Sequence, residues 1–449
     1  MSSMKSLRLL PAPARRLIAI NAVNAAGTGL VVPLLVVYLH EMRGLSLATA
    51  TGAVAATSLG ALVGGPLAGW VSDRFGRAPA VWAALVCAAL GAVGFVVSGT
   101  PEAALASGLV QGLGIGGAIT WNALIADQVP REHWSVVFST DFAVVNAVMG
   151  LGGLAGGLVA GLTDSLLVFQ LLYGLDALSF LATGFLVSRQ LRGTGQAREE
   201  AGGERAPQPA QADQTEQTEQ TEQAAPAGQP GPASYRAVLR DRKLVALLLV
   251  VLTLFTLGYS QLNSGMPAIL LADSTLGPTA LGVMFAVNTG AVVLVQVTLM
   301  HRFKDLTPRT ALALLAGSWA FFWLLILAVT GLGGGAYALL SGAAAMAVFA
   351  VGESLLAATG PTLVNSWADD SNRGRYNAAY GFVCSLGFTV GPLLSGRLVE
   401  DGHVVLMTAG AALALAALGL VLRGSRLLPS TPLSGLEDES RPVVEPAES

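Results

Sequence analysis

Long apolar runs recur along almost the whole chain, and they limit the fold more than any other feature. A helix needs about 20 predominantly apolar residues to cross the hydrocarbon core of a bilayer, and runs of that length occur twelve times. They lie near 17–39, 46–72, 79–99, 103–126, 136–162, 166–188, 244–270, 278–300, 310–331, 335–363, 375–398 and 403–422. Only 12% of the residues are charged, against about 25% in ordinary soluble proteins. The chain is therefore predicted to be an all-α membrane protein with twelve transmembrane helices.

The basic residues predict which helix ends face the cytoplasm, because cytoplasmic loops carry an excess of Lys and Arg. With the N-terminus placed inside, all of the 25 Lys and Arg residues except Arg43 and Arg397 fall on the inner side. An even number of spans then places both termini in the cytoplasm. The first run is too long for a signal-peptide core, so we expect it to be retained as a span.

Two segments of different composition divide the chain. Residues 191–242 are rich in charge, Pro and Gly, and repeat Gln-Thr-Glu over 214–223. Such a segment cannot bury a core, so it is predicted to be a disordered cytoplasmic linker, and the tail is interpreted in the same way. The predicted units are a six-helix bundle at 1–190, the linker at 191–242, a second six-helix bundle at 243–424 and a disordered cytoplasmic tail at 425–449.

The two halves repeat each other. Leu124-Ile125 precedes a polar loop and then a glycine-rich stretch that begins at Gly152. Leu363-Val364 precedes a second polar loop and a similar stretch that begins at Gly391, at the same interval. A repeat of six helices around a central site is the organisation of carriers that work by alternating access.

The polar stretch between the second and third runs reads Gly69-Trp-Val-Ser-Asp73-Arg74-Phe-Gly76-Arg77. Gly69 and Asp73 are four residues apart and share a helix face, and Gly76 allows a tight turn. The pattern G-x-x-x-D-R-x-G-R at this place resembles the signature loop of the major facilitator superfamily. The resemblance covers nearly the whole chain outside the linker and tail, and it implies two pseudo-symmetric six-helix bundles.

The same resemblance implies a gating role for this loop. Asp73 is expected to lie at the N-terminal end of the eleventh span, near 373–376, when the cytoplasmic side is closed. A carboxylate is favoured at a helix N-terminus, and Arg74 and Arg77 would complete the charge network. An ordinary basic inner loop would explain the two arginines but not Asp73. The predicted gating residues are Gly69, Asp73, Arg74, Gly76 and Arg77.

Glycines repeat along several spans and predict close helix packing. The residues expected at such contacts are Gly152, Gly156, Gly157, Gly387, Gly391 and Pro392. In the family, a G-x-x-x-G-P-x-x-G-G stripe in the fifth helix is associated with antiporters. The fifth span has Gly153 at the proline position, and the eleventh span resembles the stripe more closely. The fourth span resembles the family's R-x-x-Q-G pattern with Gly108 in place of the arginine, which leaves the coupling ion open.

Three carboxylates lie inside apolar runs, namely Asp141, Asp176 and Glu353. A charge at the bilayer centre costs about 2.5 kcal/mol or more on insertion scales, and burial favours the protonated form of a carboxyl group. Each is therefore a candidate for proton coupling or substrate binding. Glu353 and Asp141 resemble acids of the drug/proton antiporters in this superfamily, which bind cationic substrates and protons in competition. Because the family's sixth helix is peripheral, a structural role is the alternative for Asp176.

Polar side chains inside the spans predict the lining of a central cavity, with a plain interhelical hydrogen bond as the alternative role for each. The candidates are Asn21, Asn24, Gln111, Asn122, Tyr259, Gln261, Asn263, Asn288 and Tyr380. Trp121, Trp319 and Trp323 could stack on aromatic ligands. The last two are expected to face packing or lipid, because the ninth helix is peripheral in the family.

Other classes of protein are disfavoured. The four histidines lie near loops on opposite sides, and Cys87 and Cys384 have no local partner, so we expect no metal and no enzyme. No G-x-x-x-x-G-K-[ST] motif occurs, which excludes ATP-driven export. A net charge of −3 gives no reason to expect nucleic acid.

These features predict a secondary transporter that exports small lipophilic or cationic compounds in exchange for protons. No cofactor is expected beyond the proton gradient, and the expected partners are a small-molecule substrate and the lipid bilayer. The alternatives are proton-coupled uptake of a small metabolite, or a channel or membrane scaffold without transport activity. We expect a monomer. A bacterial plasma membrane is expected because Arg strongly outnumbers Lys and because Ala and Gly are abundant, a bias typical of GC-rich bacterial genomes.

Overall fold

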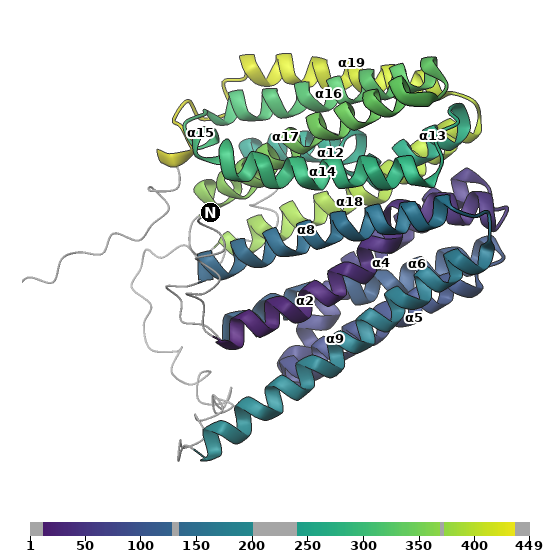
Figure 1. The fold of residues 1–449 in the computed structure, drawn as a ribbon. Helices are drawn as coiled ribbons and strands as arrows, with labels where there is room; N and C mark the ends of the chain where they lie inside the picture. The colour runs from purple at the N-terminus through teal and green to yellow at the C-terminus, as the bar shows by residue number, and fades with distance from the viewer. Residues whose placement is uncertain (1–11, 128–133, 201–239, 369–371, 436–449) are drawn as a thin grey trace, which may run out of the picture.

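The computed structural model describes residues 12–127, 134–200, 240–368 and 372–435, and the regular elements within them are helices. Twelve helical segments in these ranges are long and apolar enough to cross a membrane. They form two bundles that lie one above the other in Figure 1, the first built by residues 12–200 and the second by residues 242–424. The predicted all-α membrane fold is confirmed.

The first bundle contains the six predicted spans, two of which are built from several shorter helices. Its elements are α2 (Ala12–Val31), η1 (Val32–Leu34), α3 (Leu35–Val37), η2 (Tyr38–Met42), α4 (Leu47–Phe75), α5 (Arg77–Val97), α6 (Pro101–Ile115), α7 (Ala118–Asp127), α8 (Trp134–Gly161) and α9 (Leu166–Glu200).

The second bundle has the same number of spans. Its elements are α12 (Arg242–Leu257), η5 (Tyr259–Asn263), α13 (Gly265–Asp273), α14 (Pro278–Thr298), α15 (Met300–Phe303), α16 (Pro308–Leu332), α17 (Gly335–Trp367), α18 (Arg373–Glu400) and α19 (Val404–Gly424). Below, the linker end is the end of the bundles at which α9 finishes and α12 begins, and the far end is the opposite one.

The two bundles repeat the same helix packing. In the first, α2 packs on α8, α4 and α5 pack on α6, and α5 packs on α9. In the second, α12 packs on α18, α14 and α16 pack on α17, and α16 packs on α19. The bundles meet through α4 against α18 and α8 against α14, a reciprocal pairing that follows from the internal repeat.

Local chemistry explains where several helices begin and end. Ser46, Thr100 and Thr307 each accept a hydrogen bond from a backbone N–H in the first turn of α4, α6 and α16, and Asp241 does so for α12. A cap of this kind contributes about 1 kcal/mol to helix stability. Gly76 ends α4 with φ of 91°, a backbone conformation that favours glycine.

The first and fourth spans are interrupted, although the sequence predicts continuous helices there. Pro33 has no N–H to donate, and the chain passes through the short helix η1 at this point. The fourth span breaks between α6 and α7 at Gly116 and Gly117. A Cβ atom added to Gly116 would lie 2.5 Å from the carbonyl oxygen of Ala61, so this helix approaches α4 at backbone distance.

The seventh span is interrupted at Gly258 and Ser264, so that η5 separates α12 from α13. The carbonyl groups freed at the end of α12 find side-chain donors. Trp323 Nε1 donates to the oxygen of Leu257 at 2.6 Å, and Gln261 Nε2 donates to the oxygen of Thr256 at 2.7 Å. The break is therefore stabilised inside the second bundle without solvent, as membrane depth demands.

The ends of the bundles differ from the predicted boundaries. Helix α9 continues past residue 190 to Glu200. Residues 425–435, expected to be disordered, pack on the linker end of the second bundle. Leu428 and Leu433 are buried there, and the N–H of Leu433 donates to the oxygen of Leu306 at 3.0 Å. These two leucines give the start of the tail an apolar surface to bury. The repeat at 214–223 and the rest of the tail lie outside the described residues.

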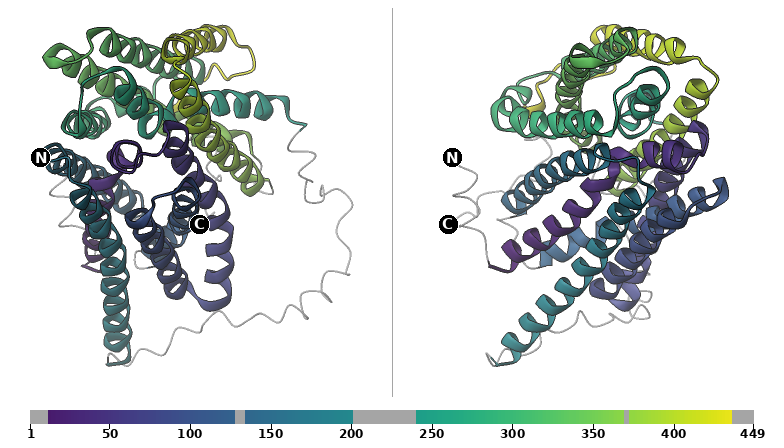
Figure 2. Two further views of the ribbon diagram at one scale, coloured as in Figure 1. Left: turned by 90° about the vertical axis from the view of Figure 1, so that its right-hand side faces the viewer. Right: turned by 45° about the vertical axis from the view of Figure 1, so that its right-hand side comes forward.

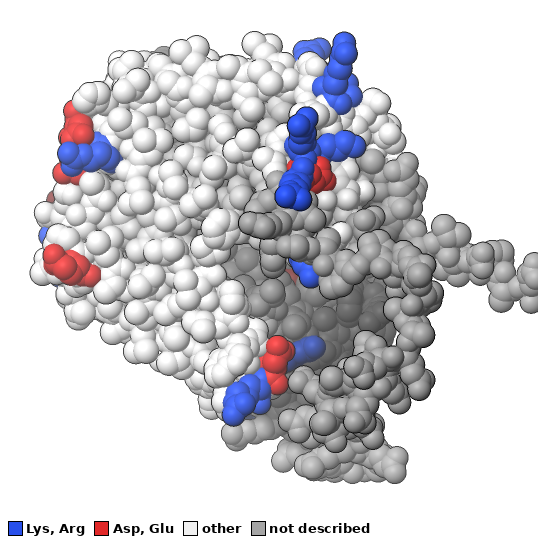
Figure 3. Space-filling model, turned by 180° about the vertical axis from the view of Figure 1, so that it is seen from behind, with Lys and Arg blue, Asp and Glu red and all other residues white. Residues whose placement is uncertain are grey.

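The surface agrees with a bilayer environment. Charged side chains gather toward opposite ends of the face in Figure 3, and a broad uncharged surface separates them. On α19, Leu413 and Leu420 are 73% and 75% exposed. Exposed aliphatic side chains in this number would be unfavourable in water but match lipid tails.

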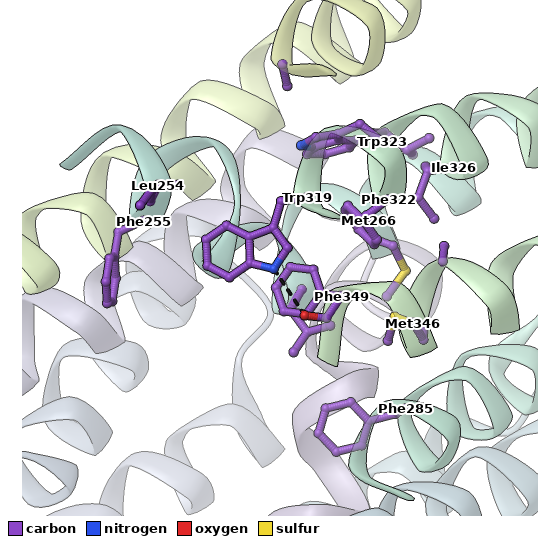
Figure 4. Packing of buried hydrophobic residues seen from close by; sticks show 14 of the residues in the cluster. Leu254, Phe255, Met266, Phe285, Trp319, Phe322, Trp323, Ile326, Met346 and Phe349 are labelled. Carbon is purple, nitrogen blue, oxygen red and sulfur yellow. Dashed lines mark hydrogen bonds between the residues drawn. The ribbon is translucent and has the colours of Figure 1, made fainter. Parts of the chain in front are cut away.

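An aromatic cluster fills the second bundle (Figure 4). Trp319, Phe322, Trp323 and Phe349 are all 0% exposed. The rings of Trp319 and Phe349 stack with centroids 5.0 Å apart, and Trp319 Nε1 donates to the Phe349 carbonyl oxygen at 3.1 Å. Trp319 and Trp323 therefore both pack in the interior of the second bundle, which is one of the two environments predicted for them, and neither faces lipid.

Candidate functional site

A cavity of about 900 Å³ lies mainly within the first bundle and reaches the second. Its lining comes from α2, η1, α3, α4, α5, α6, α7, α8 and α9, with η5 and α18 from the second bundle. The second bundle contributes Ser260, Asn263, Ser385 and Phe388. A volume of this size holds a drug-sized molecule.

One face of α2 and one face of α9 each supply three polar residues to the lining. Asn21, Asn24 and Thr28 follow one another at i, i+3 and i+7 on α2, and all three line the cavity, as their spacing predicts. The two helices run antiparallel, because Gln190 near the end of the span donates to Pro13 O at 3.0 Å while Thr28 meets Asp176. Their polar faces therefore lie side by side over three turns.

Asp141 lies two turns into α8, is 8% exposed and lines the cavity. Asn21 Nδ2 approaches both of its carboxyl oxygens, at 3.1 Å from Oδ1 and 3.0 Å from Oδ2. The side chain of α2 thus holds the carboxyl group of α8 in a fixed orientation at the cavity wall.

Asp176 lies midway along the sixth span on α9 and is 0% exposed. Thr28 Oγ1 donates to Asp176 Oδ1 at 3.2 Å, whereas Asp176 Oδ2 has no hydrogen-bond partner among the described residues. Asp176 does bond a neighbouring helix, as the structural alternative expects, but it also borders the cavity.

The charge of the cavity wall has one sign. Asp141 and Asp176 are the ionisable carboxyl groups of the lining, and no Lys, Arg or His belongs to the lining within the described ranges. Buried carboxylates without a basic partner either bind a proton or attract a cation. The cavity is therefore suited to positively charged ligands and to proton exchange.

Glu353 lies apart from the two other acids, in the interior of the second bundle on α17. Tyr259 OH donates to Glu353 Oε1 at 2.8 Å. The Tyr259 ring also packs against Phe388, with ring centroids 5.3 Å apart, and Phe388 lines the cavity. Glu353 does not belong to the lining of this cavity, and Tyr259 and Phe388 form the contact between them.

The other predicted cavity residues divide into two groups. Gln111, Asn122 and Asn263 line the cavity together with Asn21 and Asn24, whereas Tyr259, Gln261, Asn288 and Tyr380 do not. Gln261 satisfies a carbonyl of the broken seventh span, as described above. Asn288 Nδ2 lies 3.5 Å from Met346 O within the second bundle.

In a continuous α-helix Tyr259 and Asn263, four residues apart, would share one face, and the structure differs. They belong to a 3-10 helix, which has three residues per turn. Residues four apart then point about 120° away from each other, so Asn263 faces the cavity while Tyr259 faces Glu353.

Several lining residues have no counterpart in the sequence prediction. Tyr173, Phe180 and Thr183 line the cavity beside Asp176, at positions i, i+7 and i+10 of one α9 face. The spacing can be read from the sequence around Asp176. The family resemblance, however, predicts a peripheral sixth helix, so these residues are not expected at a central cavity. Phe388 and Ser385 of α18 lie in an apolar run without a local polar signal.

Glycines form the contact between the bundles on α8 and α14, here called the glycine seam (Gly150, Gly153 and Gly157 of α8, facing Gly282, Phe285 and Thr289 of α14). A Cβ added to Gly157 would lie 2.7 Å from Gly282 Cα and 2.7 Å from Pro278 O. The seam runs from the middle of the bundles to the far end.

The far end also joins α4 to α18. The backbone N–H of Ala48 donates to Glu400 Oε2 at 2.8 Å, and Gly396 packs directly on Thr51. Figure 2 includes a view of the two bundles from this end.

The other predicted packing positions lie within a bundle. Gly152 and Gly156 abut α2, where a Cβ on Gly152 would lie 2.8 Å from Ala26 O. Gly387 and Gly391 abut α12 and η5. Pro392, the next residue of α18, is buried as well.

The predicted gating loop lies at the linker end and is exposed. Asp73, Arg74, Gly76 and Arg77 are all exposed, and a Cβ added to Gly69 would meet nothing within 4 Å.

A different carboxylate lies at the first turn of α18. Tyr376 OH donates to Asp241 Oδ2 at 2.9 Å, and Asp241 also caps α12. Among the described residues, no hydrogen bond or ion pair of Asp73 with α18 is found, and the Asp73 side chain is exposed.

Comparison with known proteins places the chain among membrane transporters. A model of the Major Facilitator Superfamily matches residues 17–348. YqjV of Bacillus subtilis, described as an uncharacterized MFS-type transporter, is 24% identical over 379 residues, which cover 83% of each chain. YttB of the same organism, described in the same words, is 23% identical over 383 residues, covering 84% of this chain and 86% of its own.

Solved structures share the fold at low sequence identity. A mutant of the peptide transporter POT in complex with alafosfalin superposes with a TM-score of 0.69 at 15% identity, covering 94% of this chain and 96% of that one. The nucleoside transporter NupG superposes with a TM-score of 0.67 at 14% identity, covering 93% and 100%. With the family match over most of the sequence, the chain belongs to the major facilitator superfamily, a family of transporters and not of enzymes.

Proposed function

We propose that the protein exports small lipophilic or cationic compounds in exchange for protons, by alternating access of one central cavity. The observation that carries this proposal is the cavity wall, in which two buried carboxyl groups face a drug-sized space with no basic residue of the described ranges beside them. An organic cation and a proton would compete for such a wall, and competition of this kind couples their movements in opposite directions.

The linker end is proposed to face the cytoplasm of a bacterial plasma membrane. Within the described ranges, the Lys and Arg residues other than Arg43 and Arg397 lie toward this end, in keeping with the excess of basic residues in cytoplasmic loops. Since the bundles touch along the glycine seam and at the far end, the conformation described here would be the inward-facing one. The protein is proposed to work as a monomer, because each monomer contains a complete cavity.

Glu353 is proposed to act as a proton carrier next to the cavity and not inside it. Its carboxyl group is linked to the cavity wall through Tyr259 and Phe388. Protonation of Glu353 changes the bond that Tyr259 donates, so a proton there would alter the packing of the seventh span against α18.

The proposed function is tested by flux through the purified protein in liposomes. A lipophilic cation should move against its gradient when a proton gradient is imposed, and a neutral molecule of the same shape should move much less. Equal fluxes with and without the proton gradient would contradict proton exchange. Uphill movement in the same direction as protons would instead support uptake of a metabolite, and ionic conductance without exchange would indicate a channel.

Replacement of Asp73 by Ala is expected to lower uphill transport about tenfold without loss of membrane insertion. The contact of Asp73 with the first turn of α18 would form when the linker end closes, and a carboxylate there contributes about 1 kcal/mol or more. Flux and the amount of folded protein in the membrane should be measured together. An unchanged flux would remove the gating role of Asp73.

A further inference from the structure

Four buried polar atoms on neighbouring faces of α2 and α9 have no hydrogen-bond partner among the described residues. They are Asn24 Oδ1, Tyr173 OH, Asp176 Oδ2 and Thr183 Oγ1, and all four residues line the cavity. A buried polar atom left unpaired costs about 1–3 kcal/mol. Unpaired acceptors at the wall of a drug-sized cavity therefore indicate a ligand that supplies the missing partners.

The register of the two helices brings Asn24 Oδ1 and Asp176 Oδ2 to one region, whereas Tyr173 and Thr183 lie about 15 Å apart along α9. Thr28 bonds Asp176, and Asn24 lies one turn from Thr28 toward the linker end. Because α9 runs antiparallel to α2, Asn24 lies level with the turn that follows Asp176. Tyr173 and Thr183 flank Asp176 on the same face of α9. The site is thus centred on Asp176 and Asn24, and it is separate from the Asn21–Asp141 pair one turn further on.

The chemistry of the unpaired atoms selects the ligand group. A carboxylate oxygen and an amide oxygen are acceptors only, and a hydroxyl can accept as well. Two neighbouring acceptors, one of them negatively charged, match a primary ammonium group, which carries three N–H donors and one positive charge. Asp141 is a poorer anchor, because Asn21 already donates to both of its oxygens.

We propose that the cavity recognises lipophilic primary amines, with the ammonium group donating to Asp176 Oδ2 and Asn24 Oδ1. This inference rests on the proposed transport function and adds the substrate class and the anchoring residues. It makes Asp176 the binding residue for the cation, although the sequence favoured the other two acids.

The rest of the ligand follows from the remaining lining. Phe138, Phe142, Phe180 and Phe388 border the same cavity, and aliphatic side chains fill most of the wall between them. An aromatic or branched alkyl body attached to the ammonium group by a short chain would fit this environment. Arylalkylamines are the simplest compounds with that combination.

A methylation series tests the proposal with the charge held constant. Phenethylammonium and its N-methyl, N,N-dimethyl and N,N,N-trimethyl forms carry three, two, one and no N–H donors on the same body. Binding to the purified full-length protein in lipid nanodiscs should be measured calorimetrically, without a gradient and at a pH where all four are cations. The affinity is expected to fall at least tenfold from the primary to the quaternary form, since charge-assisted hydrogen bonds are the stronger class.

Variants connect the series to the named residues. Asn24→Ala should flatten the dependence on N–H donors, and Asp176→Asn should weaken all four cations at least tenfold. Asn146→Ala is the matched control, because Asn146 does not belong to the cavity lining and its Nδ2 donates to Phe142 O of its own helix, and its series should equal that of the wild type. Size-exclusion profiles and thermal unfolding would establish that each variant is folded.

The outcomes separate this inference from the proposed function. A quaternary form that binds as tightly as the primary amine, or a series unchanged in Asn24→Ala, would overturn the ammonium site even if lipophilic cations are exported. A steep series that depends on Asn24, in a protein without proton-driven flux, would support the site and contradict the transport mechanism.

Discussion

Glu353→Gln is expected to reduce proton-driven uphill transport at least tenfold while downhill exchange of substrate stays near the wild-type rate. A glutamine side chain has nearly the same size and can still accept the hydrogen bond from Tyr259 at the position of Oε1. It cannot gain and release a proton in the same range of pH. The substitution therefore removes the proton carrier and leaves the cavity wall in place.

Two measurements on the same liposomes distinguish these effects. Accumulation against a gradient reports coupling, and exchange of labelled for unlabelled substrate at equal concentrations reports movement of the loaded carrier. Glu102→Gln is the control, since Glu102 is an exposed acid in the first turn of α6 at the far end. Full uphill transport by Glu353→Gln would show that Glu353 does not carry the coupled proton.

Gly157→Leu is expected to lower transport at least about a hundredfold, because the glycine seam has no room for a side chain. A Cβ at this position would already lie 2.7 Å from both Gly282 Cα and Pro278 O, and backbone atoms cannot move aside as the end of a side chain can. The larger residue would hold α8 away from α14. The far end could then not close, so the cycle would stop in one orientation.

The same substitution is expected to leave each bundle folded. Each bundle packs its helices around its own interior, and the seam lies between bundles. Gly290→Ala is the matched control on α14, since a Cβ there meets nothing within 4 Å. Normal flux in Gly157→Leu would mean that close contact at the seam is not part of the cycle. Loss of folded protein would show instead that Gly157 is needed for folding.

The span count and the pairing of the two halves follow directly from the sequence because bilayer thickness imposes a minimum helix length. The same rule says nothing about interruptions inside a span. The seventh span reads as a continuous apolar run, yet it breaks at Gly258, where Trp323 of α16 and Gln261 of η5 satisfy the freed carbonyls. Such donors are visible only after the helices are packed.

The sequence likewise predicts one part of the candidate site correctly and another part incorrectly. Periodicity correctly places Asn21, Asn24 and Thr28 on one cavity-facing side of α2. It misplaces Tyr259 relative to Asn263, since a 3-10 helix turns by a different angle per residue. For Asp176 the family resemblance predicts a peripheral helix, and therefore a structural role as the alternative to substrate binding. The antiparallel register of α2 and α9 brings it to the cavity, and a register between two helices is not encoded in the pattern of either one.

The chain beyond the bundles illustrates a third kind of difference. Composition describes the tail as polar and rich in proline, but Leu428 and Leu433 bury themselves against the linker end of α15 and α16. Two apolar residues have little influence on an average over a segment. Their effect depends on an apolar surface that another part of the fold provides.

The alternating exposure of the cavity can be tested most directly by distances between spin labels at both ends of the bundles. One pair would join Phe75 on α4 to Asn377 on α18 at the linker end, and a second would join Ser46 to His403 at the far end, with Cys87 and Cys384 replaced. When substrate and pH are varied, the linker-end distance should shorten in the same population in which the far-end distance lengthens. Distances that stay fixed, or that change together in one direction, would contradict two bundles rocking around one central cavity.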